Sequence, residues 1–226
     1  ANISAQGRTL SGEGLLVSGS YFPVLGLAPA LGRLIGPDDA RVVGDGRVAV
    51  LAYDYWRGPL GGDPDILSKT IIVNGESLEI IGVAPRGFQS TSLGLTPRLF
   101  VPMTQRRTMI PGWGDDVMER RRAYWAYLFG RLKPGVSIEQ ASASINPQYT
   151  AILENTEVAL QQGMSDKTMQ EFRTKQIVLA PGARGQSSVR TEASTPLRML
   201  FGITLLVLLI ACANISNLLL ARGAAR

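Results

Sequence analysis

The sequence contains no histidine, and this absence removes several kinds of chemistry. Serine-histidine-aspartate and cysteine-histidine catalysis both need an imidazole as the general base, and histidine is also the commonest zinc ligand. Carboxylates alone could still hold a metal ion, but the acidic pairs Asp38-Asp39 and Asp115-Asp116 lack the spacing of a calcium-binding EF-hand loop. We therefore expect no catalytic residue, no cofactor and no metal site in this chain.

Two further absences concern redox chemistry and nucleotide hydrolysis. Cys212 is the one cysteine in the sequence, so the chain has no internal disulfide. No glycine is followed by lysine, whereas the phosphate-binding loop of many ATPases requires a Gly-Lys step. We expect that the chain is not an enzyme, and that any energy source is another polypeptide or a segment outside this sequence.

A long stretch without Asp, Glu, Lys or Arg runs from Met199 to Ala221. Its length of about 34 Å as a helix is enough to cross a hydrocarbon core of about 30 Å. A buried core helix of a soluble protein is disfavoured, because residues 205–210 are apolar on every side. A signal peptide is excluded by the position and length of the stretch. We predict a transmembrane helix over residues 196–222.

Arginines at the two ends of this stretch indicate its orientation. Arg222 and Arg226 follow it closely, while Arg198 alone precedes it. Positive residues are enriched on the cytoplasmic side, so we predict a cytoplasmic C-terminus and an extracytoplasmic domain over residues 1–195. Because the sequence begins at Ala1 without methionine and ends soon after the span, we expect a fragment of a longer protein.

Two asparagines interrupt the apolar character of the predicted span. Asn214 and Asn217 are three residues apart and therefore share a helix face. Amide side chains are costly to expose to lipid, so we predict that both point into a helix bundle and form hydrogen bonds across it. A direct functional role of these side chains is the alternative to this packing role.

The clearest local pattern in the extracytoplasmic part is the Asn74-Gly75 pair between two apolar runs. Asn-Gly supplies the two positive φ angles of a type I′ turn and predicts a two-residue β-hairpin. In that register Val73 faces Glu76 and Ile71 faces Leu78. One face of the hairpin is then buried, and it carries Ile71, Val73, Leu78 and Ile80.

Short apolar runs predict further strands, and capping patterns predict helices. The strands are expected at residues 15–18, 47–51, 99–102, 124–132 and 175–180, and short helical turns at residues 21–26 and 53–60. Ser137 and Gln140 have the form of a capping box, which starts a helix that is kinked at Pro147 and continues to Gln162. The sequence therefore predicts a mixed α+β domain of short strands, a hairpin and one long helix, followed by one transmembrane helix.

A polar segment over residues 103–122 carries two arginine clusters, Arg106-Arg107 and Arg120-Arg121-Arg122. We expect this segment to be mobile, with a turn at residues 111–114. The clusters fit either a solvated face or a surface that meets anionic lipid headgroups or an acidic partner. No ribonucleoprotein pattern or basic helix is present, so we expect no nucleic acid partner.

In their order along the chain, seven motifs resemble the MacB/FtsX-like permeases of ABC transporters. They are Val17–Gly26, Pro29–Arg33, Val48–Leu51 with Trp56, Val73–Gly75 followed by Ile80–Pro85, Phe100–Pro102, Arg131–Ser137 and Ala211–Arg222. The last motif resembles the branch often called duplicated orphan permeases. Together the motifs extend over nearly the whole chain.

This resemblance implies an architecture and a function. Residues 1–195 would be a MacB-like periplasmic core domain of two mixed subdomains, residues 196–222 a transmembrane helix, and residues 223–226 the start of a cytoplasmic coupling segment. The protein would be a noncatalytic permease subunit in the bacterial inner membrane that works by mechanotransmission. A separate cytoplasmic ATPase would drive periplasmic rearrangement for efflux or extraction of a substrate. Its implied partners are that ATPase, a second permease copy, membrane lipid and, in some relatives, a periplasmic adaptor.

Two alternatives belong to other functional classes. A membrane-tethered extracytoplasmic binding or sensor module would use the helix only as an anchor, and the asparagine face argues against it, because a lipid-facing tether should lack polar residues. An anchored hydrolase is disfavoured further, because the sequence has neither histidine nor a nucleophile motif.

Overall fold

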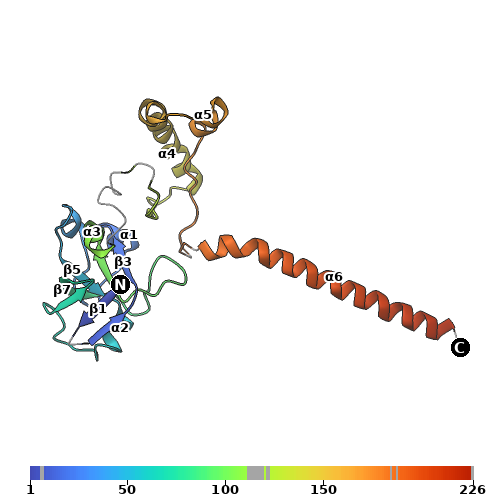
Figure 1. Ribbon diagram of the computed structural model, residues 1–226, viewed down its shortest axis with the longest axis horizontal. Coiled ribbons are helices and arrows are strands. Elements are labelled where there is room, and N and C mark those ends of the chain that lie inside the picture. The colour runs from blue at the N-terminus through green and yellow to red at the C-terminus, as the bar shows by residue number, and fades with distance from the viewer. Residues whose placement is uncertain (6–7, 111–119, 121–122, 184, 187, 225–226) are drawn as a thin grey trace. The chain divides into compact units, whose positions relative to one another are not determined.

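A computed structural model describes residues 1–5, 8–110, 120, 123–183, 185–186 and 188–224 (Figure 1). The strands are β1 (Asn2–Ala5), β2 (Arg8–Ser11), β3 (Gly14–Val17), β4 (Leu31–Gly32), β5 (Val48–Leu51), β6 (Thr70–Val73), β7 (Glu76–Val83) and β8 (Leu99–Pro102). The α-helices are α1 (Tyr21–Leu25), α2 (Tyr53–Arg57), α3 (Arg106–Met109), α4 (Ile138–Ile152), α5 (Asp166–Arg173) and α6 (Ser188–Ala224). The predicted mixed α+β fold with a long C-terminal helix is confirmed.

All eight strands form one mixed sheet, in which seven follow the order β2-β1-β6-β7-β5-β8-β3 and β4 pairs with β7. The pairs β3 with β8 and β5 with β7 are parallel, and the others are antiparallel. The strands β7, β5 and β8 therefore lie inside the sheet, where both of their edges are paired.

The predicted hairpin is confirmed as β6 and β7. Its register pairs Val73 with Glu76 and Ile71 with Leu78, and the turn residues Asn74 and Gly75 have φ angles of 50° and 92°. The four predicted apolar positions are at most 1% exposed. The Asn74 amide also donates to the Met109 carbonyl oxygen (2.7 Å), so the turn is fixed by tertiary structure as well.

Aromatic rings fill the core beside α1. Phe22 of α1 packs edge-to-face on Phe100 of β8, with ring centroids 5.3 Å apart. Phe88 stacks on Phe100 at 5.8 Å and also contacts Phe22 at 6.3 Å. The helix α1 ends as predicted at a glycine, Gly26, in the left-handed conformation.

Two predicted strands are wrong. Residues 124–132 and 175–180 contain no strand. The sequence of residues 124–132 alternates aromatic and aliphatic side chains, but a strand also requires a neighbouring backbone to accept its hydrogen bonds. Among the described residues, neither segment has a partner in the sheet.

The polar segment after β8 also differs from its prediction. Met103–Gln105 is a 3-10 turn that leads into α3, and Thr104, Gln105 and Arg106 are at most 5% exposed. The Gln105 amide donates to the carbonyl oxygens of Gly44 and Asp45, both at 2.7 Å. These contacts order a segment that composition alone presents as mobile.

The first arginine cluster is therefore only partly a surface feature. Arg106 is buried, with its guanidinium carbon 5.3 Å from the centroid of the Trp125 ring, so at this position the predicted solvated or lipid-facing surface is wrong. Arg107 is exposed. The predicted turn at residues 111–114 lies outside the described residues, as do Arg121 and Arg122.

The capping box before α4 is confirmed. Gln140 N donates to Ser137 Oγ at 3.2 Å, and Ser137 N donates to Gln140 Oε1 at 2.9 Å. The helix passes through Pro147 and continues as a π-helical turn at Leu153–Glu157 and a 3-10 turn at Val158–Leu160. Helical structure therefore ends close to the predicted Gln162, whereas α5 was not predicted.

The long helix α6, coloured orange to red in Figure 1, begins at Ser188, eight residues before the predicted span. It continues without a break through Pro196. The chain divides into two compact units, one of residues 1–90 with 95–184 and one of residues 91–94 with 185–226. The short segment Thr91–Gly94 thus belongs to the unit of α6 although its neighbours in sequence belong to the sheet.

Candidate functional site: the apolar helix and the loop after β4

Between Pro196 and Ser216, the helix α6 presents exposed apolar side chains on every side. These 21 residues have a mean hydropathy of 2.3, and their most apolar part is not buried against any other described residue. Twelve large apolar side chains in this stretch are 51% to 75% exposed. At about 1 to 2 kcal/mol each, leaving them in water would cost on the order of 15 to 20 kcal/mol. At about 31 Å, the stretch matches the thickness of a bilayer core.

Two of the polar side chains in this stretch find partners within the helix itself. Thr204 Oγ1 donates to the Leu200 carbonyl oxygen and Ser216 Oγ donates to the Cys212 carbonyl oxygen, both at 2.8 Å. These hydroxyls can face lipid at little cost, because their hydrogen bonds are already made.

Asn214 differs from these hydroxyl residues. Its exposed side chain forms no hydrogen bond with any other described residue, and an amide offers two donor hydrogens and an acceptor oxygen, more than the single hydroxyl hydrogen of Thr204 or Ser216. Asn217 follows within the same helix and lies on the same side of the backbone, while its side chain lies outside the described residues. The predicted interhelical role of both asparagines stays a prediction.

Two of the arginines from which the orientation is predicted lie at the two ends of the apolar stretch. Arg222 is exposed in the last turn of α6, and Arg198 is exposed near the start of the stretch. A cation in the last turn of a helix also interacts favourably with the helix dipole. Arg226 lies outside the described residues.

In the compact unit that contains the sheet (residues 1–90 with 95–184), several motif residues lie where β4 pairs with β7. Gly32 pairs with Gly82, and a Cβ atom on Gly82 would lie 2.0 Å from the Arg33 carbonyl oxygen. A Cβ atom on Gly32, whose φ is +65°, would lie 2.4 Å from the Ile81 carbonyl oxygen. Only glycine fits at either position. These two motif residues therefore allow the backbones of β4 and β7 to approach closely, and this approach sets the position of the Arg33 backbone.

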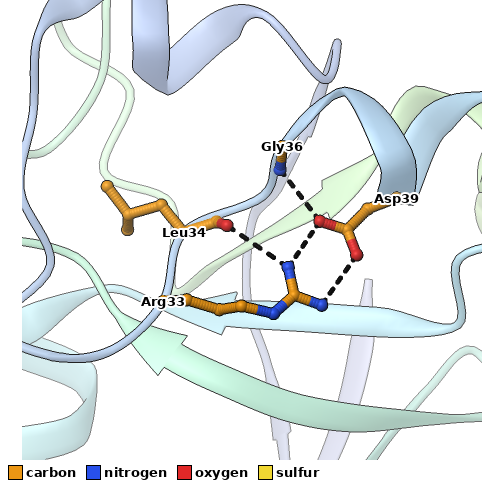
Figure 2. A network of polar contacts seen from close by, with 4 residues as sticks. All are labelled: Arg33, Leu34, Gly36 and Asp39. Atoms are coloured by element: carbon orange, nitrogen blue, oxygen red, sulfur yellow. Dashed lines mark hydrogen bonds and ion pairs between the residues drawn. The ribbon is translucent and has the colours of Figure 1, made fainter.

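Arg33 and Asp39 form the strongest polar network in the loop after β4, shown in Figure 2. Arg33 Nη1 donates to Asp39 Oδ2 at 2.6 Å and Nη2 donates to Asp39 Oδ1 at 2.8 Å, while Gly36 N donates to Oδ2 at 2.9 Å. The carboxylate is only 10% exposed, whereas the Arg33 side chain is 56% exposed. The arrangement is the bidentate geometry in which Arg and a carboxylate bind most strongly.

This network changes the protonation behaviour of both groups. The hydrogen bonds from Arg33 hold the pKa of Asp39 below its usual value, against the opposing effect of burial, and the Gly36 amide adds to the lowering. The same contact raises the pKa of Arg33. Sequence analysis missed the pair, and the signal that could have found it is the Gly-Arg step followed six residues later by Asp39.

Other shifted carboxylates have local structural causes. A hydrogen bond from the Lys69 ammonium lowers the pKa of Asp63, and a hydrogen bond from Ser137 lowers the pKa of Glu139. In the part of the chain that the structure describes, no three His, Cys, Asp or Glu side chains gather closely enough to hold a metal ion.

Similarity to known proteins agrees with this description. Residues 2–148 match the family described as the MacB-like periplasmic core domain. No curated protein matches the chain. Among solved structures, the chain is similar to the extracellular domain of the noncanonic ABC-type transporter YknZ from Gram-positive bacteria, at 18% identity over 47% of this chain and 51% of that chain, with a TM-score of 0.39. It is also similar to the periplasmic region of MacB from Actinobacillus actinomycetemcomitans, at 16% identity over 73% and 72% of the two chains, with a TM-score of 0.45.

The chain thus spans about half the length of the YknZ domain. The match to the family, by contrast, covers well over half of the 226 residues and includes all eight strands of the sheet. The chain belongs to the family of MacB-like periplasmic core domains of ABC transporter permeases.

Proposed function

We propose that this chain is part of a noncatalytic permease subunit that couples ATP hydrolysis by a separate ATPase to conformational change in the periplasm, for efflux or extraction of a substrate. The observation that carries the proposal is the length of α6. Its 37 residues span about 55 Å, whereas the predicted span of residues 196–222 needs about 40 Å. The helix begins eight residues before that span, and a rigid helix that continues beyond the membrane can transmit movement to the domain outside it, which a flexible linker cannot.

The proposed topology follows the charges around the span. Residues 1–195 form the periplasmic core domain, residues 196–222 the transmembrane helix, and residues 223–226 the beginning of the cytoplasmic coupling segment. Arg222 and Arg226 then lie on the cytoplasmic side of the bacterial inner membrane. The partners in this proposal are a cytoplasmic ABC ATPase, a second permease copy and, where the system has one, a periplasmic adaptor.

The runner-up is a membrane-tethered binding or sensor module. Asn214 favours the permease, because an unsatisfied amide in a lone lipid-facing anchor is unfavourable, whereas a helix bundle supplies partners. Interhelical hydrogen bonds of this kind contribute about 0.6 to 2 kcal/mol each. Two asparagines on one face can therefore bias helix association measurably.

The test uses the full-length permease in nanodiscs with its cytoplasmic ATPase. Hydrogen exchange of the periplasmic domain is measured with and without a non-hydrolysable ATP analogue, and the permease proposal expects a nucleotide-dependent change. The double variant Asn214→Leu/Asn217→Leu is expected to weaken subunit association roughly 10-fold. Thr204→Leu is the matched control, because the Thr204 hydroxyl is satisfied within its own helix. If hydrogen exchange of the periplasmic domain is the same with and without nucleotide, and the double variant associates as the wild type does, the tethered module is the better description.

A further inference from the structure

The segment directly before α6 is hydrogen-bonded to a loop of the sheet that lies some 90 residues earlier in the sequence. Gln186 N donates to the Thr91 carbonyl oxygen at 2.7 Å, and Leu93 N donates to the Gln186 carbonyl oxygen at 2.8 Å. The two bonds make Ser92 and Gln186 partners in a parallel β-bridge. We call residues Thr91–Gly94 the coupling loop, and it forms one compact unit with the segment that contains α6.

A hydrogen bond joins the two ends of the coupling loop where it leaves the rest of the sheet domain. Ser90 Oγ donates to the Leu95 carbonyl oxygen at 3.0 Å, which ties together the two residues that flank the loop. Phe88, just before this closure, packs on Phe22 and Phe100 of the core. This hydrogen bond and the packing of Phe88 therefore restrain the residues on both sides of the coupling loop.

The strands that flank this loop are β7 and β8, which occupy interior positions in the sheet. β7 lies between β6 and β5, and β8 lies between β5 and β3. Val83 at the end of β7 and Leu99 at the start of β8 are both fully buried. Close-packed interiors transmit displacement and do not deform locally, so movement of the loop acts on the centre of the sheet.

The covalent route from α6 to the sheet is much longer. Followed backwards along the chain, it passes residues 174–183, then α5, α4, residues 110–137 and α3 before it reaches β8. A longer covalent route has more backbone dihedral angles that can change without moving β8. The route through the Gln186 bridge needs only the eight residues from Thr91 to Arg98 to reach Leu99.

We propose that the coupling loop is the mechanical link through which movement of α6 reaches the periplasmic sheet. This inference rests on the proposed function, because it specifies where in the fold the coupling occurs. When α6 shifts or tilts, the paired backbone of Gln186 carries Thr91 and Leu93 with it, and the joined ends of the loop pass that displacement to β7 and β8. The helices α4 and α5 are not required for this transfer of displacement from α6 to the sheet.

Two glycines provide a matched test. Gly185 has a φ of +67°, and a Cβ atom there would lie 2.6 Å from the Thr91 carbonyl oxygen, so Gly185→Ala should break the bridge. Gly94 has a φ of +86° with nothing within 4 Å of an added Cβ, so Gly94→Ala introduces similar backbone strain in the coupling loop without a steric clash. In the full-length protein in nanodiscs, Gly185→Ala is expected to speed exchange of the Gln186 and Leu93 amides roughly 10-fold, and Gly94→Ala by less than about 3-fold.

The second measurement asks whether the bridge transmits movement. With the cytoplasmic ATPase present, a non-hydrolysable ATP analogue is expected to change exchange in the peptide that contains β8, and Gly185→Ala should reduce that change at least about 5-fold while Gly94→Ala retains it. A variant that has lost the bridge yet responds as the wild type does would overturn the link while leaving the permease function in place. A wild-type protein without any nucleotide response would overturn the proposed function, and the link with it.

A cross-link tests the same idea without weakening the fold. Ser92→Cys with Gln186→Cys, in a Cys212→Ser background, places two thiols on paired backbones about 4.8 Å apart, within the range that a disulfide spans. The oxidised protein is expected to keep the full nucleotide response at β8. A response that disappears on oxidation would mean that the bridge must open during coupling, which contradicts a permanent mechanical link.

Discussion

Replacing Asp39 by asparagine measures how strongly the loop after β4 is held. The carboxylate accepts three hydrogen bonds, two from the Arg33 guanidinium and one from the Gly36 amide. Asparagine keeps one acceptor oxygen but loses the charge and at least one of the bonds from arginine. Hydrogen bonds to charged groups contribute about 1.5 to 3 kcal/mol, and the exposure of the Arg33 side chain, 56%, argues for the lower end of that range.

We therefore expect Asp39→Asn to lower the free energy of unfolding by about 1.5 kcal/mol. For a chain of this size that corresponds to a fall in Tm of about 3 to 6 °C, measured by tryptophan fluorescence on the whole chain in nanodiscs. Asp38→Asn is the control. Asp38 is paired with Arg41, but their side chains are 83% and 73% exposed, so its removal should change the free energy of unfolding by less than about 0.5 kcal/mol.

The pH dependence gives an independent check with a defined sign. Because Asp39 has a lowered pKa in the folded chain, its stabilisation is complete above its unfolded pKa of about 3.9 and is lost as the pH falls through the lower folded value. The difference between the wild type and Asp39→Asn should stay constant from about pH 5 to 8 and shrink below about pH 4. Equal Tm shifts for the two asparagine variants, or a difference that persists in acid, would refute the assigned role of the network.

The remaining predictions concern the pairing of β4 with β7 and the cap of α4. Gly82→Ala places a Cβ atom 2.0 Å from the Arg33 backbone and should destabilise the sheet by about 3 kcal/mol or more in urea unfolding, while Gly130→Ala, which meets nothing within 4 Å, should change little. Ser137→Ala removes the confirmed cap and should lower stability by about 1 kcal/mol, with faster amide exchange in the first turn of α4. Ser144→Ala, at an exposed position inside the same helix, should be neutral or slightly stabilising. Equal effects within either pair would contradict the geometry given above.

The elements predicted successfully are those whose cause is local. Asn74-Gly75 selects its turn type by backbone conformation alone, and the register of the hairpin follows from the turn. Ser137 and Gln140 satisfy each other across one helical turn, so their pattern needs no tertiary information. The long apolar helix α6 follows from local sequence as well, while its placement across a membrane stays a prediction from length and composition.

The missed features depend on partners that are distant in the sequence. Residues 124–132 have the alternation of a strand but no described partner strand, and periodicity cannot indicate whether a partner exists. Gln105 is buried because the carbonyl groups of Gly44 and Asp45, some 60 residues earlier, accept its amide hydrogens. Single-sequence patterns carry no information about such pairs, which explains why the burial of Arg106 was missed as well.

The bridge between Gln186 and the coupling loop bears directly on the choice between a transporter and a tether. An anchor that only holds a domain at the membrane surface works best with a flexible connection. Pairing Gln186 with Thr91 and Leu93 restricts that flexibility and costs backbone entropy. A simple tether gains no benefit from this cost. The same pairing is advantageous if displacement of α6 has to reach the buried strands β7 and β8. The geometry before α6 therefore favours a helix that moves the domain over one that merely holds it.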